Sequence, residues 1–194
     1  MIDIDPKQTV VLSMDFQNDI VSNFAPTAPD LLTRAGRVLD HARAASIPVV
    51  HVVVQFRPGY PEVGERGMFT MVRGSNRLVE GTAGAAIHEA VAPKSGDVVV
   101  TKRRVCAFSG SDLDVILRAF NCRHLVLLGV ATSGVVLSTV RAAADLDYTM
   151  HVVTDCCADR EPVVHEFLVS RIFPRMAPGI TAEEFAEAVK PHTV

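Results

Sequence analysis

The sequence lacks any apolar run long enough to cross a bilayer. Even the continuous stretch Leu125–Leu128 falls far short of the roughly 20 residues that a transmembrane helix needs. Basic patches and acidic runs are also missing, because 19 Lys and Arg and 22 Asp and Glu residues are scattered and leave a net charge of −3. Such a spread excludes the electrostatic footprint of a nucleic-acid-binding protein and a charged disordered tail. We therefore expect neither a membrane nor a nucleic acid as partner.

Secretion and disulfide signals are absent too. The N-terminal segment MIDIDPKQTV has neither the basic nor the apolar region of a signal peptide. Cys106, Cys122, Cys156 and Cys157 form no CxxC motif, and no histidine stands at a zinc-finger spacing from them. These features predict a cytoplasmic protein whose cysteines are free thiols in small apolar sites.

What the sequence does contain is the pattern of one α/β domain, which we place over residues 1–194. Short β-branched runs alternate with amphipathic helical patterns, which is typical of a parallel sheet covered on both faces. We expect a three-layer α/β/α, Rossmann-like fold with a mostly parallel five- or six-stranded sheet. The predicted strands are Thr9–Met14, Pro48–Val54, Val98–Thr101, His124–Leu128 and Met150–Thr154, with a weak sixth around Met176–Ile180.

Helical periodicity fills the gaps between the strands. We expect helices over Asp30–Ala45, about 134–147 and about 161–173. A Ser-x-x-Asp cap from Ser111 to Asp114 predicts the start of another helix, and Thr181 with Glu184 predicts a capping box for a short last helix. Residues 56–80 have no sustained period, and a loop that long is usually a lid or a partner-binding segment.

Polar residues at the carboxyl ends of the strands are the first candidates for a site, because ligands of open parallel sheets bind there. Asp15 follows the first strand, Gln55 and Arg57 the second, Lys102 the third and Asp155 the fifth. An aspartate and a lysine that leave buried strands toward one crevice should pair, since each charge lowers the desolvation cost of the other. The alternatives are a turn-forming aspartate and a solvated lysine.

Other titratable residues are assigned structural roles. Asp155 and Asp159 are interpreted as caps of the helix that follows them. The dispersed histidines show no ligand spacing and are interpreted as structural or surface residues; they are His51, His88, His124, His151 and His165.

Five segments, in order, resemble the isochorismatase-like cysteine hydrolases. VVLSMDFQND resembles the opening motif that supplies an Asp, here Asp15, and EGTAGAAIHEAVAP resembles the Gly-Thr-x-Gly segment. The family segment with the active-site Lys, here Lys102, resembles TKRRVCAFSGSDLDVILR. Its Gly-Val-x-Thr-x-x-Cys-Val segment with the following helix resembles LVLLGVATSGVVLSTVRAAADLDY, and its strand that ends in Asp-x-x-Ala-Asp resembles VVTDCCAD. The resemblance covers about residues 8–175 and implies a hydrolase of a small molecule that assembles as a dimer or tetramer. It also implies a cis peptide bond within residues 129–132, at Val130–Ala131.

The nucleophilic cysteine of that family falls on Val135, whose isopropyl group cannot attack a carbonyl. Cys106, four residues after Lys102, is one alternative nucleophile, although packing is its other interpretation. Ser133 is a weaker alternative, since it lacks the first Gly of a nucleophile elbow and a histidine to serve it. HVVVQFRPGY offers no Asp-x-His pair after the second strand, so no catalytic metal and no other cofactor are expected.

Members of the family that resemble true isochorismatases also lack the cysteine and hydrolyse an enol ether. That chemistry needs a positioned acid and a charge-tuned pocket, which Asp15 and Lys102 would supply. Those members carry a Tyr two residues after the fourth-strand Gly, where this chain has Ala131. Isochorismate itself is therefore not implied as the substrate.

Residues around the same strand ends are the expected substrate contacts. They are Phe16, Gln17, Gln55, Arg57, Phe108, Ala131, Thr132, Ser133 and Gly134. An anionic group would be bound by arginines of the long loop, for which Arg57, Arg66 and Arg73 are candidates. Phe56 and Tyr60 are further candidates for the pocket wall, and Asn18 for positioning Asp15 or a water.

Three hypotheses follow from these residues. The first is a cysteine-independent hydrolase that uses Asp15 and Lys102 on an anionic or enol-ether metabolite. The second is an amidase-like hydrolase with a relocated nucleophile such as Cys106. The third is a catalytically silent protein kept for ligand binding or assembly.

Overall fold

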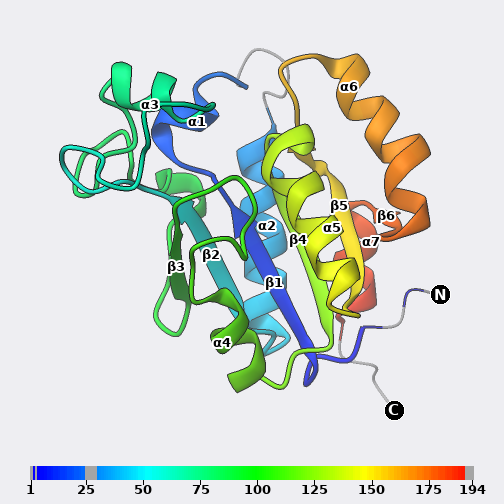
Figure 1. Cartoon of the computed structure of the whole chain (residues 1–194). Helices are drawn as coiled ribbons and strands as arrows, with labels where there is room; N and C mark the ends of the chain where they lie inside the picture. The colour runs from blue at the N-terminus through cyan, green and yellow to red at the C-terminus, as the bar shows by residue number, and fades with distance from the viewer. Residues whose placement is uncertain (1, 3, 25–29, 191–194) are drawn as a thin grey trace.

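A computed structural model describes residues 2, 4–24 and 30–190 as a six-stranded sheet between helical layers (Figure 1). Strand order is β3-β2-β1-β4-β5-β6, and every neighbouring pair is parallel. The strands are β1 Thr9–Met14, β2 Val49–Val54, β3 Val98–Lys102, β4 His124–Val130, β5 Thr149–Ala158 and β6 Gly179–Ile180. The predicted α/β fold with a mostly parallel sheet is confirmed. The order reverses between β1 and β4, which makes that junction the place for a ligand crevice.

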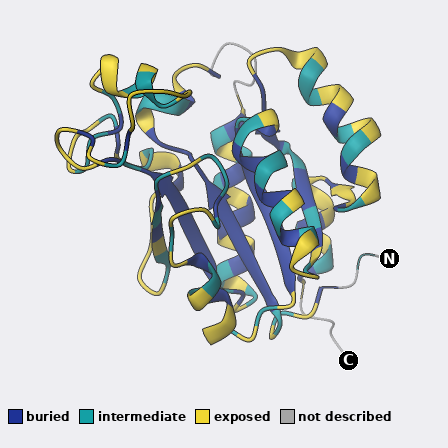
Figure 2. Cartoon of the chain, viewed as in Figure 1, coloured by how far each residue is buried: buried dark blue, intermediate teal, exposed yellow. Residues whose placement is uncertain are grey.

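Helices cover both faces of the sheet because its central strands are apolar on both. All residues of β1, β2 and β4 are buried (Figure 2). Val11 of β1 belongs to the core under α2 (Leu31–Ala44) and α7 (Ala182–Ala188). Its neighbours Val10 and Leu12 belong to the core under α4 (Leu113–Ala119) and α5 (Leu137–Asp145). This alternation is the period-2 pattern of a strand buried on two sides.

Three of the predicted helices differ from the structure at their ends. The helix expected at about 134–147 is α5, which begins only at Leu137, after a turn over Thr132–Val136 that is kinked at Gly134. The helix expected at about 161–173 is α6 (Pro162–Phe167), continued by a π-helical turn over Leu168–Ile172 and a 3₁₀ turn over Phe173–Arg175. The cap expected from Ser111 to Asp114 differs in detail: Asp112 precedes the first helical residue, while the Ser111 hydroxyl donates to Ala107 O and accepts a hydrogen bond at 3.4 Å from Leu113 N–H in the first turn of α4.

The capping box of α7 is present as predicted. Glu184 N–H donates to Thr181 Oγ1 at 3.1 Å, and Thr181 N–H donates to Glu184 Oε2 at 2.7 Å. The remaining short helices are α1 (Asn18–Val21), α3 (Thr70–Gly74) and a 3₁₀ turn over Glu89–Val91. Within the described residues no helix combines the length and the apolar character that a membrane span requires.

The irregular segment 56–80 contains only α3 as regular structure, and it lies over the carboxyl ends of β1 and β2 at one end of the molecule (Figure 1). It has an apolar cluster of its own, in which Phe56, Tyr60, Val63 and Leu78 pack with Val54 of β2. The Tyr60 hydroxyl donates to Arg77 O at 2.7 Å and ties the two ends of the segment together. Phe56 and Tyr60 thus support the loop and do not line the crevice described below.

The junction of β1 and β4 requires a glycine. A Cβ at Gly129 would lie 2.5 Å from Met14 O and 2.8 Å from Met14 Cβ, which is closer than atoms that are not bonded can approach. The next peptide bond, Val130–Ala131, is cis, as the family resemblance implied. Close contact of these two strands brings their carboxyl ends, Asp15 and residues 130–135, to one edge.

We predict that Gly129→Ala destabilises the fold by about 1–3 kcal/mol, because the added methyl group has no room beside the main chain of β1. Gly74→Ala is the matched control, since no atom lies within 4 Å of a Cβ there, and its effect should stay below about 1 kcal/mol. Urea unfolding followed by circular dichroism measures both. Equal urea midpoints for the two variants would show that β4 can move away from β1 without any loss of stability.

Candidate functional site

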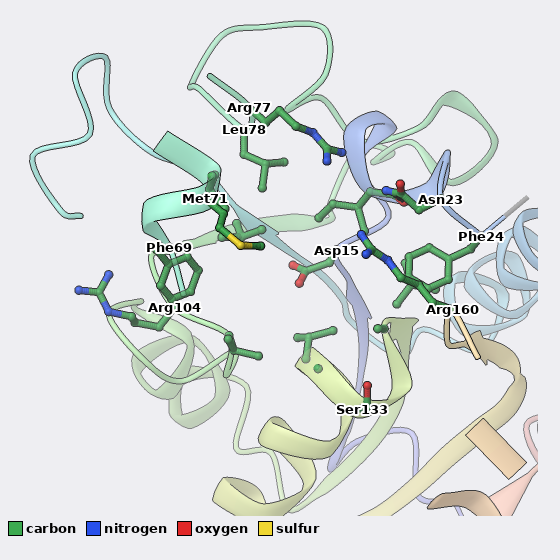
Figure 3. Close-up of a pocket in the computed structure, with 18 of the residues that line it drawn as sticks. Asp15, Asn23, Phe24, Phe69, Met71, Arg77, Leu78, Arg104, Ser133 and Arg160 are labelled. Atoms are coloured by element: carbon green, nitrogen blue, oxygen red, sulfur yellow. Dashed lines mark hydrogen bonds between the residues drawn. The ribbon is translucent and has the colours of Figure 1, made fainter. Parts of the chain in front are cut away.

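A cavity of about 620 Å³ opens beyond the carboxyl ends of β1, β3, β4 and β5. Asp15 and Lys102 end two of these strands, and the chain after β4 and β5 supplies residues 131, 133–135 and 159–160. α1 and the segment that contains α3 form the opposite wall. Figure 3 shows Asp15 near the middle of the cavity, between Arg160 and the wall that carries Phe69, Met71 and Arg104.

Asp15 and Lys102 form the buried ion pair that the strand ends predicted. Lys102 Nζ donates to Asp15 Oδ2 at 2.9 Å and to Arg104 O at 3.0 Å. Only 6% of Asp15 and 1% of Lys102 is exposed. Asp15 has a left-handed backbone (φ 59°), and its N–H donates to Val52 O at 2.9 Å. The turn directly after β1 therefore fixes the carboxyl group against the ammonium.

One oxygen of Asp15 is available for chemistry. Asp15 Oδ1 is buried and has no hydrogen-bond partner among the described residues. Burial raises the pKa of this carboxyl above its usual value, and the neighbouring charge and hydrogen bond of Lys102 oppose that rise without cancelling it. A carboxyl group that keeps its proton to higher pH is suited to donate it.

The wall around Val135 is the turn Thr132–Val136, which is kinked at Gly134 (φ −93°, ψ −105°) and which two polar contacts hold in place. Asp159 Oδ2 accepts a hydrogen bond from Ser133 N–H at 2.7 Å, and Thr132 Oγ1 lies 2.8 Å from His165 Nδ1 of α6. Val135 lines the cavity while only 2% of it is exposed. The position at which the family resemblance places a thiol is thus a packed aliphatic surface beside the acid.

Three arginines, Arg77, Arg104 and Arg160, give the cavity a cationic rim. Arg77 binds the main-chain oxygen of Asp19, and Arg104 stacks over Phe69 with its guanidinium carbon 5.5 Å from the ring centroid. Arg160 makes no ion pair with any residue that the structure describes. With Lys102 already paired to Asp15, Arg160 is the free cation best placed for an anionic group of a ligand.

The expected substrate contacts divide into two groups. Ala131, Ser133 and Gly134 line the cavity. The other six are not among the residues that line it: Phe16, Gln17, Gln55, Arg57, Phe108 and Thr132.

Each of those six side chains is engaged elsewhere. Gln17 donates to Val54 O and Ala85 O and accepts from Val54 N–H, so it ties β2 to the loop before β3. Gln55 also donates to Ala85 O, and Arg57 pairs with Glu62. Phe16 is core, Phe108 stacks on Tyr148 with ring centroids 6.2 Å apart, and Thr132 contacts His165.

Several other predicted roles also change. Cys106, the alternative nucleophile, is not among the residues that line the cavity. Arg66 and Arg73 do not line the cavity either, and Arg73 donates to Val63 O. Asn18 donates its side-chain N–H to Ala83 O, away from Asp15.

The two aspartates expected to cap the following helix bind other elements. Asp155 Oδ1 accepts from Ala182 N–H in the first turn of α7, and Asp159 supports the turn that contains Ser133. The histidines have structural contacts, such as His51 with Asp97 at 3.2 Å and His124 with His151 at 2.8 Å. No group of three or more His, Cys, Asp or Glu side chains is arranged to hold a metal ion in the described part of the chain.

Arg160 is one of the cavity residues that the sequence interpretation missed. It comes two residues after the end of β5, so the rule that selected Asp15 and Lys102 also applies to it. The predicted strand ended at Thr154, whereas β5 continues to Ala158. Because the strand is four residues longer at its end than predicted, the residues that follow it at the cavity are Asp159 and Arg160.

Comparisons with known proteins agree on one family. The model of the isochorismatase domain matches residues 9–184. The uncharacterized isochorismatase family protein YwoC of Bacillus subtilis is 31% identical over 189 residues, 97% of this chain and 98% of that protein. Maleamate amidohydrolase of Pseudomonas putida is 28% identical, with 95% and 88% covered. The structure of an isochorismatase family protein from Burkholderia thailandensis has a TM-score of 0.82 at 27% identity, with 96% and 97% covered.

We predict that Lys102→Met destabilises the protein by about 3–5 kcal/mol at neutral pH, because it leaves the Asp15 carboxylate buried without its partner. Loss of the ammonium raises the pKa of Asp15 further, so the penalty should shrink as the pH falls and the folded state takes up a proton. Urea unfolding at several pH values measures this dependence.

Lys94→Met is the control, because Lys94 pairs with Asp40 at an exposed position and should contribute less than about 1 kcal/mol. Lys102→Met combined with Asp15→Asn should recover part of the loss, since the amide carries no charge. A pH-independent penalty in Lys102→Met would show that lost packing, and not the unpaired charge, causes it.

Proposed function

Because the chain belongs to the isochorismatase family, we propose that it hydrolyses a small anionic metabolite with Asp15 as the proton donor and without a covalent thiol intermediate. The observation that carries the proposal is the buried pair of Asp15 and Lys102 at the cavity wall, in which Asp15 Oδ1 has no partner among the described residues. Val135 lines the same wall and offers no nucleophile. The proposal assigns the attack to water, in place of the Ser133 hydroxyl that also lines the cavity.

The reaction that fits this set of groups is hydrolysis of an enol ether. Protonated Asp15 gives its proton to the terminal carbon of the vinyl group, and an oxocarbenium ion forms. Water adds to that ion, the hemiketal releases the alcohol and a ketone, and the water proton returns the Asp15 carboxylate to its acid form. Lys102 stabilises the carboxylate while it is charged. No step requires a side-chain nucleophile.

An anionic substrate is supported by the charges around the cavity. Arg160 has no ion-pair partner among the described residues, and Arg104 contributes a second positive charge to the rim. An arginine fork binds a carboxylate through two parallel hydrogen bonds. Phe24, Phe69 and Leu78 provide apolar surface between these charges, which suits a small carboxylic acid with an unsaturated body.

Amide hydrolysis is the second candidate, because relatives such as maleamate amidohydrolase and the ureidoacrylate amidohydrolase RutB of Agrobacterium fabrum carry that activity in their names. The latter is 30% identical over 169 residues, with 76% of this chain and 74% of that protein covered. In this chain the carboxylate form of Asp15 would then activate water as a general base. The position of Cys106 outside the cavity lining does not support attack by that thiol.

We predict that Asp15→Asn lowers turnover by about 10²- to 10⁴-fold, which is the usual contribution of a general acid or base. Cys106→Ala should retain wild-type turnover. The measurement is a product screen of small enol ethers and small amides, each with and without a carboxylate, on the wild type beside both variants.

Circular dichroism of Asp15→Asn checks that loss of activity is not loss of fold. A Cys106→Ala variant that is folded but inactive would contradict the proposal and support a mechanism in which the Cys106 thiol attacks. If the wild type binds compounds of the screen but converts none, the chain is a ligand-binding member of the family.

The pH dependence separates the two reactions. An enol-ether hydrolase needs protonated Asp15, so kcat/KM should be constant at low pH and fall about tenfold per pH unit above the raised pKa of this carboxyl. Water activation by the carboxylate requires the opposite, a rise with pH that levels off above the same pKa. The pH profile of kcat/KM on the best substrate of the screen decides between them.

A further inference from the structure

The side chain of Asp19 joins two segments of the cavity wall that lie far apart in the chain. Asp19 belongs to α1, which contributes Ile20 to the wall, while the segment 56–80 contributes Arg77 and Leu78 (Figure 3). Asp19 Oδ2 accepts a hydrogen bond from Leu78 N–H at 3.1 Å, and Arg77 Nε lies 3.8 Å from the same oxygen. Arg77 also donates to Asp19 O. One residue therefore holds the end of the segment 56–80 against α1.

The loop before β3 leaves room for this carboxylate. A Cβ at Gly84 would lie 2.3 Å from Asp19 Oδ1 and 2.6 Å from Asp19 Oδ2, so a side chain at residue 84 would displace the carboxylate. The backbone of Gly84 has no positive φ, so space, and not a turn, is what this position requires. Gly84 O also accepts a hydrogen bond from Asp19 N–H at 2.8 Å. Asp19 thus connects α1 with residues 77–78 and with residue 84, and this set of contacts is called the Asp19 clamp.

Leu78 has a backbone conformation that its side chain disfavours. Its φ is 59°, in the left-handed region that bulky residues rarely adopt. Leu78 lines the cavity, and its carbonyl oxygen accepts a hydrogen bond from Phe56 N–H at 2.9 Å within the segment 56–80. The hydrogen bond to Asp19 comes from outside that segment. Strained backbone persists only where the surroundings hold it, and it is concentrated at elements that bind ligands. We therefore expect Leu78 to depend on Asp19 for its place in the wall.

We propose that Asp19 is a positioning residue for substrate binding. Asp19 is not among the residues that line the cavity, so it acts through Arg77 and Leu78, which are. The inference rests on the proposed function, because the substrate would lie between this wall and Asp15. The apolar surface of Leu78 contacts a bound molecule equally before and during the reaction, so a displaced wall weakens binding without changing the chemical step at Asp15. Loss of the Asp19 clamp should therefore raise KM and preserve kcat.

The kinetic test compares Asp19→Ala, Gly84→Ala and the double variant on the best substrate of the product screen. Asp19→Ala removes the carboxylate and Gly84→Ala displaces it, so each should raise KM about tenfold while kcat stays within about threefold of the wild type. A methyl group at residue 84 has room once the carboxylate is gone, so the double variant should bind substrate no worse than Asp19→Ala alone. Independent effects would multiply instead, to about a hundredfold. The matched controls should keep the wild-type KM; they are Asp40→Ala, at an exposed ion pair with Lys94, and Gly64→Ala, where no atom lies within 4 Å of a Cβ.

Hydrogen exchange followed by mass spectrometry tests the Asp19 clamp without turnover. Amides of residues 77–84 should exchange about tenfold faster in Asp19→Ala than in the wild type, since Leu78 N–H has lost its acceptor, while those of β1 keep their rates. A wild type that converts no compound of the screen would contradict the proposed function, and the exchange rates would still decide whether Asp19 holds the wall. Wild-type exchange of residues 77–84 in Asp19→Ala would overturn the inference. So would a wild-type KM in that variant, or a double variant in which the two single effects on KM multiply.

Discussion

The contact between Asp15 and Lys102 is the constraint around which the cavity is built. A carboxyl group and an ammonium, each removed from water, are stable only together, and their strands must end at the same edge for that to happen. β1 and β3 are separated by β2 in the sheet, so the long lysine side chain spans the intervening strand to reach Asp15. Arg104 O accepts a second hydrogen bond from Lys102 and holds the following loop beside the pair.

The part of the cavity wall beside this pair is formed where the chain leaves β4. Gly129 lets β4 approach Met14 of β1 closely, and the chain then turns through residues 131–136 before α5 begins. Asp159 and His165 hold that turn from β5 and α6. A wall with several independent supports keeps its shape without a ligand, and preorganised polar groups are what electrostatic catalysis needs. Val135 gives that wall an aliphatic side chain at the position where the family resemblance places a thiol.

A residue's place in the cavity could be predicted from the sequence only where the residue stands at a strand end, because the strand order determines which other residues lie near it. Asp15 and Lys102 follow buried apolar runs whose ends are evident, and their pairing needed only the parallel order of the sheet. Arg160 was missed because β5 continues four residues past its apolar run, through Asp155 and the cysteine pair to Ala158. Gln17 was expected at the ligand because it follows Asp15, but its side chain points into the protein, where it satisfies main-chain groups of β2 and residue 85.

The sequence by itself determined where the buried strands run, their parallel arrangement, the pairing of Asp15 with Lys102, and the absence of a thiol at residue 135. Those properties follow from local patterns, since burial on two faces demands continuous apolar runs and the first polar residue after such a run marks the end of β1 at Asp15, although β5 continues past Asp155 to Ala158. The tertiary structure decided which polar side chains are free to contact a ligand and which hydrogen-bond to main-chain groups of the protein. That decision depends on contacts that the local pattern does not show, such as the bond from Gln17 to Ala85 O, while Arg160 beside the cavity has no ion-pair partner among the described residues.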